Sequence, residues 1–374
     1  MESQTETHRK QKKWLRLLLF PLPLQGHVSP MLQLANLLYS KGFSITIIHT
    51  CFIRSPKYPS NNPHFTFHSI PNGLSKSECS DADNLVALVS ILNANCAVRF
   101  VIAWLNSIAK SLQLPRFVLR TNNISSFLAL AALALLQEKG YLPIQESQEE
   151  KPVIELPPLK VKDIPVFKTQ DQERLHQTIA ALVEQTKSYT GLIWNSFEEL
   201  EHGLLSQDQS AISWLNKQAP KSVIYNGWNH YQKGFMEEIK ERGHVVKWAP
   251  QQEVLAHTAV GGFWTHSGWN STLESISEGV PMICHPCFGD QRVNARYVSD
   301  VWRIGVHLES KVDRFEIANV VRKLLVEAEG HEIRDRILQF KKMANQSTQQ
   351  QGSSYRSLES LVSLILSSQS QRKL

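Results

Sequence analysis

The sequence alternates short apolar runs, many of them β-branched, with longer helical stretches, and this alternation is the strongest constraint on its fold. In the first half, the predicted strands are 17–20, 44–50, 65–70, 116–120 and 191–195, and the predicted helices are 31–40, 85–114, 125–139 and 172–188. In the second half, the predicted strands are 222–225, 244–247, 260–264 and 281–284, and the predicted helices are 252–257, 270–278 and 292–301, with mostly helical sequence thereafter. Strands that alternate with helices form parallel sheets covered on both faces, so the sequence predicts an α/β protein with two similar halves.

Two breaks in the pattern suggest the domain organisation. Residues 145–166 are rich in Pro, Glu and Lys, and we interpret them as an extended surface segment. A second break near 207–221 marks the predicted boundary between an N-terminal domain (1–220) and a C-terminal domain (221–350), and a final helix within 351–374 is predicted to pack back on the N-terminal domain. Ligands bind outside the carboxyl ends of parallel strands, so two such domains can share one site.

Composition excludes several classes of protein. The net charge is +6, but acidic and basic residues are interspersed, so the sequence predicts no nucleic-acid partner. The basic cluster at 8–13 and the apolar run after it imitate a secretory signal peptide. Two prolines interrupt that run and no small-residue cleavage site follows, so a first β-strand is the better interpretation. The apolar run 127–136 is too short to span a bilayer. Five cysteines, an odd number, fit a reduced cytosolic protein, so we expect a cytoplasmic monomer without membrane insertion.

Metal binding is not expected either. The spacing of Cys284 and Cys287 resembles that of a metal site, but no second pair completes four ligands.

Polar side chains gather where the predicted strand 260–264 ends and a helix begins. Gly268 lets the backbone approach a ligand closely, and Asn270 or Ser271 can cap the helix. The free N–H groups and partial positive charge of a helix N-terminus suit a phosphate. His266 lies beside this terminus in the sequence and can donate to a phosphate oxygen.

Other residues of the same region could recognise the rest of a nucleotide sugar. Glu274 follows Asn270 by four residues, so it shares a helix face and could accept hydrogen bonds from a ribose diol. Trp248 could stack on a flat base, and Asp290 with Gln291 could bind sugar hydroxyls. Each feature alone is common in α/β proteins, as a core Trp or a helix cap. Their gathering at one sheet edge is the stronger indication.

The segment WAPQQEVLAHTAVGGFWTHSGWNSTLESISEGVPMICHPCFGDQ, 44 residues from Trp248 to Gln291, resembles the signature box of plant UDP-glycosyltransferases almost position for position. Flanking stretches such as LPLQGHVSPMLQLANLL and GLIWNSFEELE resemble the family as well. The nearest subgroup contains glucosyltransferases for terpenoids, cytokinins and other small metabolites. The resemblance implies a GT-B fold, in which two Rossmann-like domains face each other across a cleft, with the acceptor in the N-terminal domain and UDP-sugar in the C-terminal domain.

The resemblance also implies roles for individual residues. Carried over to matching positions, the donor-binding residues are Trp248 and Ala249 at uracil, Glu274 at ribose, His266, Asn270 and Ser271 at pyrophosphate, Trp269, Asp290 and Gln291 at the sugar, and Gln251. Gln at the last box position resembles glucose users. The family needs no metal or cofactor, and UDP-glucose is a co-substrate. The acceptor pocket is expected around 73–80, 93–96 and 122–127.

The implied mechanism inverts the anomeric carbon. A hydroxyl or carboxyl of the acceptor attacks that carbon, with His27 of the GHVSP motif as the base. The helix N-terminus and His266 stabilise the charge that develops on the leaving UDP. In the family, an aspartate orients the catalytic histidine, as in a Ser-His-Asp arrangement.

The chain departs from the family pattern in two places. The strand that should carry the aspartate is absent before 101–105, and the nearest acids upstream, Asp81 and Asp83, fit a helix cap better. After 222–225, a strand–helix–strand portion of the donor domain is missing. Two hypotheses stay open: an active UDP-glucosyltransferase, or an impaired UDP-sugar-binding paralogue. A Rossmann oxidoreductase is set aside, because no Gly-x-Gly-x-x-Gly follows the first strand.

Overall fold

A computed structural model describes residues 14–22, 25–49, 64–69, 107–166, 172–186, 188–195, 218–226, 243–246, 249–309 and 313–370. All pairings between its named strands are parallel, as the alternation of strands and helices predicts. By contacts the chain divides into two compact units, Met1–Ile102 and Ala103–Leu374. The functional boundary predicted at residue 220 stays a prediction.

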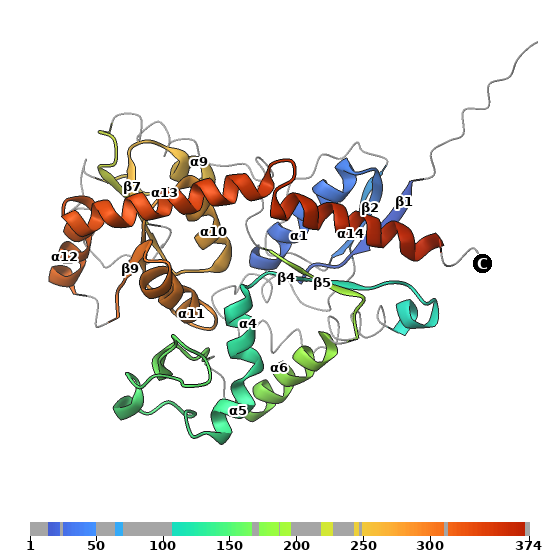
Figure 1. Ribbon diagram of the computed structural model, residues 1–374, viewed down its shortest axis with the longest axis horizontal. Coiled ribbons are helices and arrows are strands. Elements are labelled where there is room, and N and C mark those ends of the chain that lie inside the picture. The colour runs from blue at the N-terminus through green and yellow to red at the C-terminus, as the bar shows by residue number, and fades with distance from the viewer. Residues whose placement is uncertain are drawn as a thin grey trace, which may run out of the picture. The chain divides into compact units, whose positions relative to one another are not determined.

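The first unit contains a three-stranded sheet in the order β1-β2-β3 with one described helix (Figure 1, blue). Its elements are β1 (Leu15–Leu19), α1 (Gln25–Ser40), β2 (Phe43–His49) and β3 (Phe65–Ser69). The central strand β2 is the most buried, and Ile45 and Ile47 are at most 1% exposed. The helix begins at Gln25 rather than at residue 31 and continues through Pro30, so the GHVSP motif is helical.

The second unit begins with a parallel strand pair and three helices. These are β4 (Phe117–Arg120), α4 (Ile124–Ala131), α5 (Leu133–Glu138), α6 (Gln172–Thr186) and β5 (Gly191–Trp194). The single helix predicted over 125–139 is two helices that meet at Ala132.

The segment 145–166 is not the extended surface segment that its composition suggested. It forms short 3₁₀ helices at Glu146–Gln148 and Val161–Asp163. Most of its apolar residues, interspersed among Pro, Glu and Lys, pack in one core with α4 and α5. The buried members from this segment are Val153, Leu159, Val161 and Ile164, whereas Ile154 is exposed. Composition misled here, because most of the few apolar positions fold inward.

A four-stranded sheet, in the order β6-β7-β8-β9, forms the centre of the second unit. Its strands are β6 (Val223–Asn226), β7 (Val260–Thr265), β8 (Met282–Cys284) and β9 (Gly305–His307). Two differences from prediction stand out: β9 was missed within the sequence expected to be helical, and 243–246 forms no strand. Among the described residues, β6 is therefore an outer strand with β7 as its only strand neighbour.

Helices pack around this sheet (Figure 1, gold to red). They are α9 (Gln251–Ala256), α10 (Trp269–Glu278), α11 (Gln291–Arg296), α12 (Arg314–Leu325) and α13 (Ala328–Thr348), and a π-helical turn, Tyr297–Val301, continues α11. Helix α14 (Ser353–Ser370) follows α13 and packs against it. The core between sheet and helices contains Phe263, Met282, Ile276 and Ile337. On a second, smaller cluster with Ile224 and Leu324, Gly262 of β7 permits close packing, because a Cβ there would lie 2.7 Å from Ile224 Cδ1 and 2.9 Å from Leu324 Cδ2 and would displace them.

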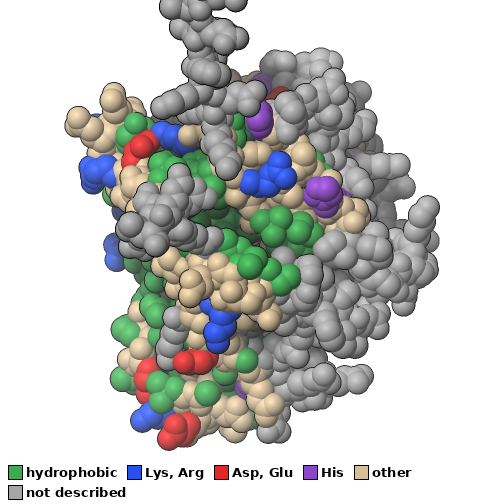
Figure 2. Space-filling model, turned by 90° about the vertical axis from the view of Figure 1, so that its right-hand side faces the viewer, with side chains coloured by type: hydrophobic (Ala, Val, Ile, Leu, Met, Phe, Trp, Pro, Cys, Tyr) green, Lys and Arg blue, Asp and Glu red, His purple; other side chains and the backbone are tan. Residues whose placement is uncertain are grey.

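The surface of the described residues is mixed. Figure 2 shows charged side chains of both signs interspersed with hydrophobic ones on one face. The most exposed large hydrophobic side chains are Phe315, Ile154 and Val326, at 79%, 73% and 69%. Within the described ranges, every helix is too short or too polar to cross a bilayer.

Candidate functional site

The turn from β7 into α10 is the centre of the candidate site. Strand β7 ends at Thr265, and α10 begins at Trp269, with Gly268 as its N-cap residue. The expected cap by Asn270 or Ser271 is wrong: both follow inside the first turn, and no side chain caps the helix. The N–H groups of that turn therefore remain suited to an anion.

Ser267 gives this turn its shape. Its backbone is left-handed, with φ of 62°, a conformation that costs a non-glycine residue free energy and that recurs at functional sites. The Ser267 N–H donates to Thr265 Oγ1 at 3.1 Å, and the Ser267 carbonyl accepts from Asn294 Nδ2 at 2.8 Å. These two bonds hold the turn from both sides.

His266 packs over Gly268. A Cβ at position 268 would collide with His266 Nε2, so any residue larger than glycine there must displace the imidazole. Burial lowers the pKa of His266 below its ordinary value of 6.5. The imidazole is consequently neutral at pH 7 and can donate one ring N–H beside the helix terminus.

One face of α10 carries a polar cluster with α9. Gln251 Nε2 donates to Ser271 Oγ at 3.0 Å and to Glu274 Oε2 at 2.5 Å. Burial raises the Glu274 pKa, the hydrogen bond from Gln251 partly offsets this shift, and the net pKa is about 7. A carboxylate desolvated this far can gain from further donors, such as the hydroxyls of a diol. The sequence predicted Glu274 for that task, and the structure adds Gln251 as its partner.

Asp290 and Gln291 lie at the start of α11. Gln291 is 6% exposed, and its Oε1 accepts from the Cys287 and Phe288 N–H groups at 2.9 and 3.2 Å. Burial also raises the pKa of Asp290. Because Asn294 of the same helix bonds to Ser267, the start of α11 and the turn before α10 form one polar region.

Asn195, which follows β5, was missed by sequence reasoning. Its carbonyl accepts from the Trp269 indole N–H at 2.7 Å, and its Nδ2 donates to Asn270 Oδ1 at 3.1 Å. Trp269 is 8% exposed, so its indole N–H serves this internal bond. The only signal in the sequence was an Asn at the end of the predicted strand 191–195, at the carboxyl edge where ligands bind.

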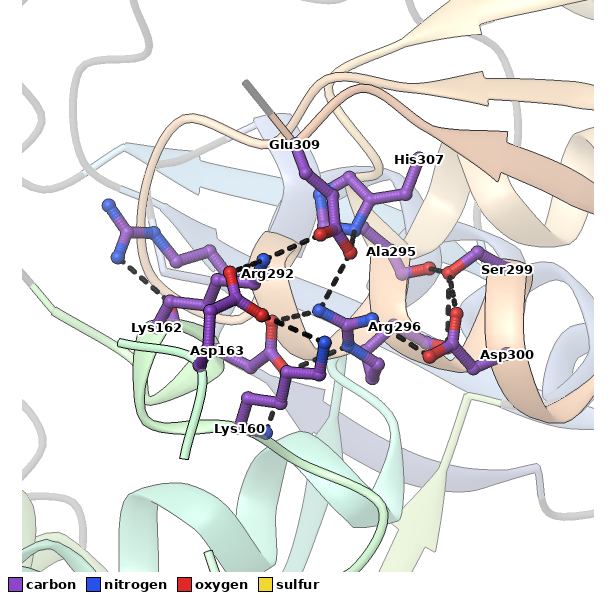
Figure 3. Close-up of polar contacts among 11 residues, drawn as sticks. Lys160, Lys162, Asp163, Arg292, Ala295, Arg296, Ser299, Asp300, His307 and Glu309 are labelled. Carbon is purple, nitrogen blue, oxygen red and sulfur yellow. Dashed lines mark hydrogen bonds and ion pairs between the residues drawn. The ribbon is translucent and has the colours of Figure 1, made fainter. Parts of the chain in front are cut away.

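A buried ion network anchors the other end of α11 (Figure 3). Arg296, 2% exposed, pairs through Nε with Asp163 at 2.8 Å and through its two Nη atoms with Asp300 at 2.8 Å and Glu309 at 2.9 Å. Lys162 bonds Glu309 at 2.5 Å. The network joins the segment 145–166 to α11 and to the residues after β9. Burial by itself would lower the pKa of Arg296, but the surrounding carboxylates raise it. Sequence reasoning missed it.

The remaining predicted site residues are placed less completely. Ala249 is partly buried against the core of the four-stranded sheet, whereas Trp248 lies outside the described residues. His27 is half-buried in the first turn of α1, in the other compact unit. Asp81 and Asp83 also lie outside the described residues. No group of three or more His, Cys, Asp or Glu in the described part could hold a metal ion.

The sequence is similar to curated plant enzymes. It is 41% identical to UDP-glycosyltransferase 76B1 of Arabidopsis thaliana over 441 aligned positions, covering 94% of this chain and 98% of that protein. It is 38% identical to UDP-glycosyltransferase 76G1 of Stevia rebaudiana, covering 98% of this chain and all of that one. Because 441 positions exceed the 374 residues of the chain, at least 67 positions of the first relative have no counterpart here.

Solved structures give the same fold. Phytolacca americana UGT2, complexed with UDP-2fluoro-glucose and pterostilbene, superposes with a TM-score of 0.76 at 22% identity, covering 94% of this chain and 99% of that one. The UDP-glucose: anthocyanidin 3-O-glucosyltransferase in complex with UDP gives 0.75 at 23%, covering 95% and 100%. The predicted GT-B fold is confirmed. The family model for UDP-glucoronosyl and UDP-glucosyl transferases matches residues 157–343, and the chain belongs to this family of plant UDP-glycosyltransferases.

Proposed function

We propose that the chain transfers glucose from UDP-glucose, with inversion, to a hydroxyl or carboxyl group of a small, mostly apolar plant metabolite. The observation that carries this proposal is the arrangement at the N-terminus of α10. An uncapped helix start, the neutral His266 and the partly buried Glu274 lie within one strand–turn–helix unit, β7 to α10. Together they suit the phosphates and the ribose of one nucleotide.

The proposed donor contacts are those that the resemblance to the family implies. The N–H groups of the first turn, His266, Asn270 and Ser271 bind the pyrophosphate, and Glu274 accepts from the ribose diol. Trp248 and Ala249 bind uracil, while Trp269, Asp290 and Gln291 face the sugar. Glucose as the sugar is supported by the family tendency at the last box position and by relatives named as glucosyltransferases.

The proposed chemistry needs one base and a stabilised leaving group. His27 removes the acceptor proton as the acceptor oxygen attacks the anomeric carbon and the bond to UDP breaks. Negative charge then grows on the leaving phosphate, where α10 and His266 offer donors that are already oriented. The reaction therefore uses neither a metal nor a cofactor in this proposal, and activity should persist in excess EDTA.

Sequence that the relatives have and this chain lacks favours a second candidate function, that of a catalytically impaired UDP-sugar-binding protein. Relatives carry at least 67 aligned positions that this chain lacks, and the family aspartate is among the features absent from its sequence pattern. In a serine protease, replacing the analogous aspartate lowers kcat about 10⁴-fold, and this value belongs to that enzyme. In this alternative, the chain binds UDP-sugar and turns it over slowly or not at all.

One set of assays separates the two functions. Calorimetric titration with UDP measures donor-site binding, and radiolabelled UDP-glucose with a panel of phenols and terpenoid alcohols measures transfer. Proton NMR of the product gives its anomeric configuration, and UDP-galactose tests the sugar preference. Transfer with a β-linked product supports the first function, whereas binding without transfer supports the second. Absence of UDP binding would contradict both.

Two further properties belong to this proposal. We expect a cytoplasmic monomer that binds neither nucleic acid nor membranes. Size-exclusion chromatography with light scattering tests the monomer, and localisation of a fluorescent fusion in plant cells tests the compartment.

A further inference from the structure

Asn294 of α11 connects three parts of the fold around the turn 266–269, which lies between β7 and α10. It is fully buried, and its Oδ1 accepts from Asn123 Nδ2 at 2.8 Å and from Ser126 Oγ at 3.0 Å. Its Nδ2 donates to the Ser267 carbonyl at 2.8 Å. Asn123 caps α4, where its Oδ1 accepts from the Ser126 N–H at 2.6 Å. One amide thus joins α4, α11 and the turn before α10.

The bond to Ser267 matters because that residue is strained. A serine at φ of 62° keeps this conformation only where surrounding contacts over-determine it. The Ser267 carbonyl leads directly into the Gly268 N-cap, so a rotation there would redirect the first N–H groups of α10. The Asn294 amide opposes that rotation, and it is itself held by two bonds from α4.

We propose that Asn294 is a positioning residue: it holds the Ser267 carbonyl and so keeps the 266–269 turn in the conformation that binds the donor diphosphate. This inference rests on the proposed function for its ligand. Its structural part, the clamp on a strained turn, is independent of any ligand. The residue acts on the donor through Ser267 and Gly268 and does not touch it.

Substitution at the two partners tests the clamp. Asn294→Ala removes it, and Asn294→Asp keeps the volume and the acceptor oxygen but loses the donor to Ser267. Ser267→Gly removes the strain instead, because glycine adopts a positive φ without a Cβ penalty. If the clamp serves to hold a strained serine, the double variant Asn294→Ala/Ser267→Gly recovers much of what Asn294→Ala loses.

Hydrogen exchange without ligand is the first measurement. Asn294→Ala and Asn294→Asp should speed exchange of the peptide covering 265–271 by about tenfold, and Ser267→Gly should reverse most of that gain. UDP-glucose affinity, measured by calorimetry, should weaken by a similar factor of about ten and be rescued in the same double variant.

Ser275→Ala is the matched control. Ser275 is equally buried on α10, and its Oγ donates to the Val280 carbonyl at 2.6 Å, at the far end of the helix. This variant should lower Tm comparably yet leave the exchange of 265–271 and the UDP-glucose affinity unchanged.

Two results would overturn the clamp: unchanged exchange at 265–271 in both Asn294 variants, or losses that add in the double variant without rescue. If the wild-type chain binds no UDP-glucose, the proposed function fails. The exchange data on the unliganded proteins still decide whether Asn294 holds the turn.

Discussion

The proposed role of Glu274 predicts that donor binding depends on pH, with a sign that tests this role. Its pKa of about 7 means that about a tenth of the side chains are ionised at pH 6 and about nine-tenths at pH 8. If the ionised form accepts the ribose hydroxyls, UDP-glucose should bind about tenfold more tightly at pH 8 than at pH 6, or about 1.4 kcal/mol. Glu274→Gln should abolish this pH dependence.

The assay is calorimetric titration in two buffers with different ionisation enthalpies. UDP-glucose is the better titrant, because the terminal phosphate of UDP, like other phosphate monoesters, titrates near pH 6. Binding at pH 6 to 7 should release protons from the wild-type protein and none from Glu274→Gln. Protonation of His266 would favour anion binding at low pH, which is the opposite trend. An affinity that is flat, or that falls with rising pH, would refute the role given to Glu274.

The same carboxyl also affects stability. Its pKa is raised on folding from 4.5 to about 7, so between these values the native state holds a proton that the unfolded state has lost. Stability is therefore lost as pH rises through this window, by about 3 kcal/mol in total at pH 8. Urea unfolding of Glu274→Gln should show this gain at pH 8 and little change at pH 4.

Three further variants test other parts of the site. His27→Ala should lower kcat by about 10²- to 10⁴-fold in a glucosyl-transfer assay without changing UDP-glucose affinity, since it acts only as a base; equal rates would exclude that role. Gly268→Ala should displace His266 and weaken UDP-glucose binding at nearly constant Tm. Arg296→Met should cost about 3–5 kcal/mol in urea unfolding, because it leaves the buried carboxylate of Asp163 without a cationic partner. The more exposed pair of Lys323 and Glu329 is the control, and Lys323→Met should cost less than about 1 kcal/mol.

The periodicity of the sequence predicted most of the strands, because buried parallel strands give short apolar runs. Predicted and observed bounds differ by one residue at both ends of β2 and by one residue at the end of β7. Strand β9 was missed because its three residues, Gly305–His307, are too few to establish a period. The helix predicted over 31–40 starts too late, because α1 begins at Gln25 and accommodates Pro30 within its first turns.

The candidate site was predicted where residues act locally and missed where they act across the fold. His266, Ser271 and Glu274 follow one another on a strand–turn–helix unit, so their spacing sufficed. Asn195 reaches Trp269 across 74 residues, and the ion pair of Arg296 with Asp163 spans 133. Nothing in the neighbouring sequence encodes such partners, because the packing of separate elements creates them.

The pairing of β6 has a consequence outside the chemistry of the enzyme. Val223 of β6 pairs with Val260 of β7, which lies 37 residues further along the chain. A contact between residues so far apart forms only after the intervening loop has closed. During synthesis, β6 must therefore wait for β7 to be made, so the four-stranded sheet assembles late, after the helices of the preceding segment.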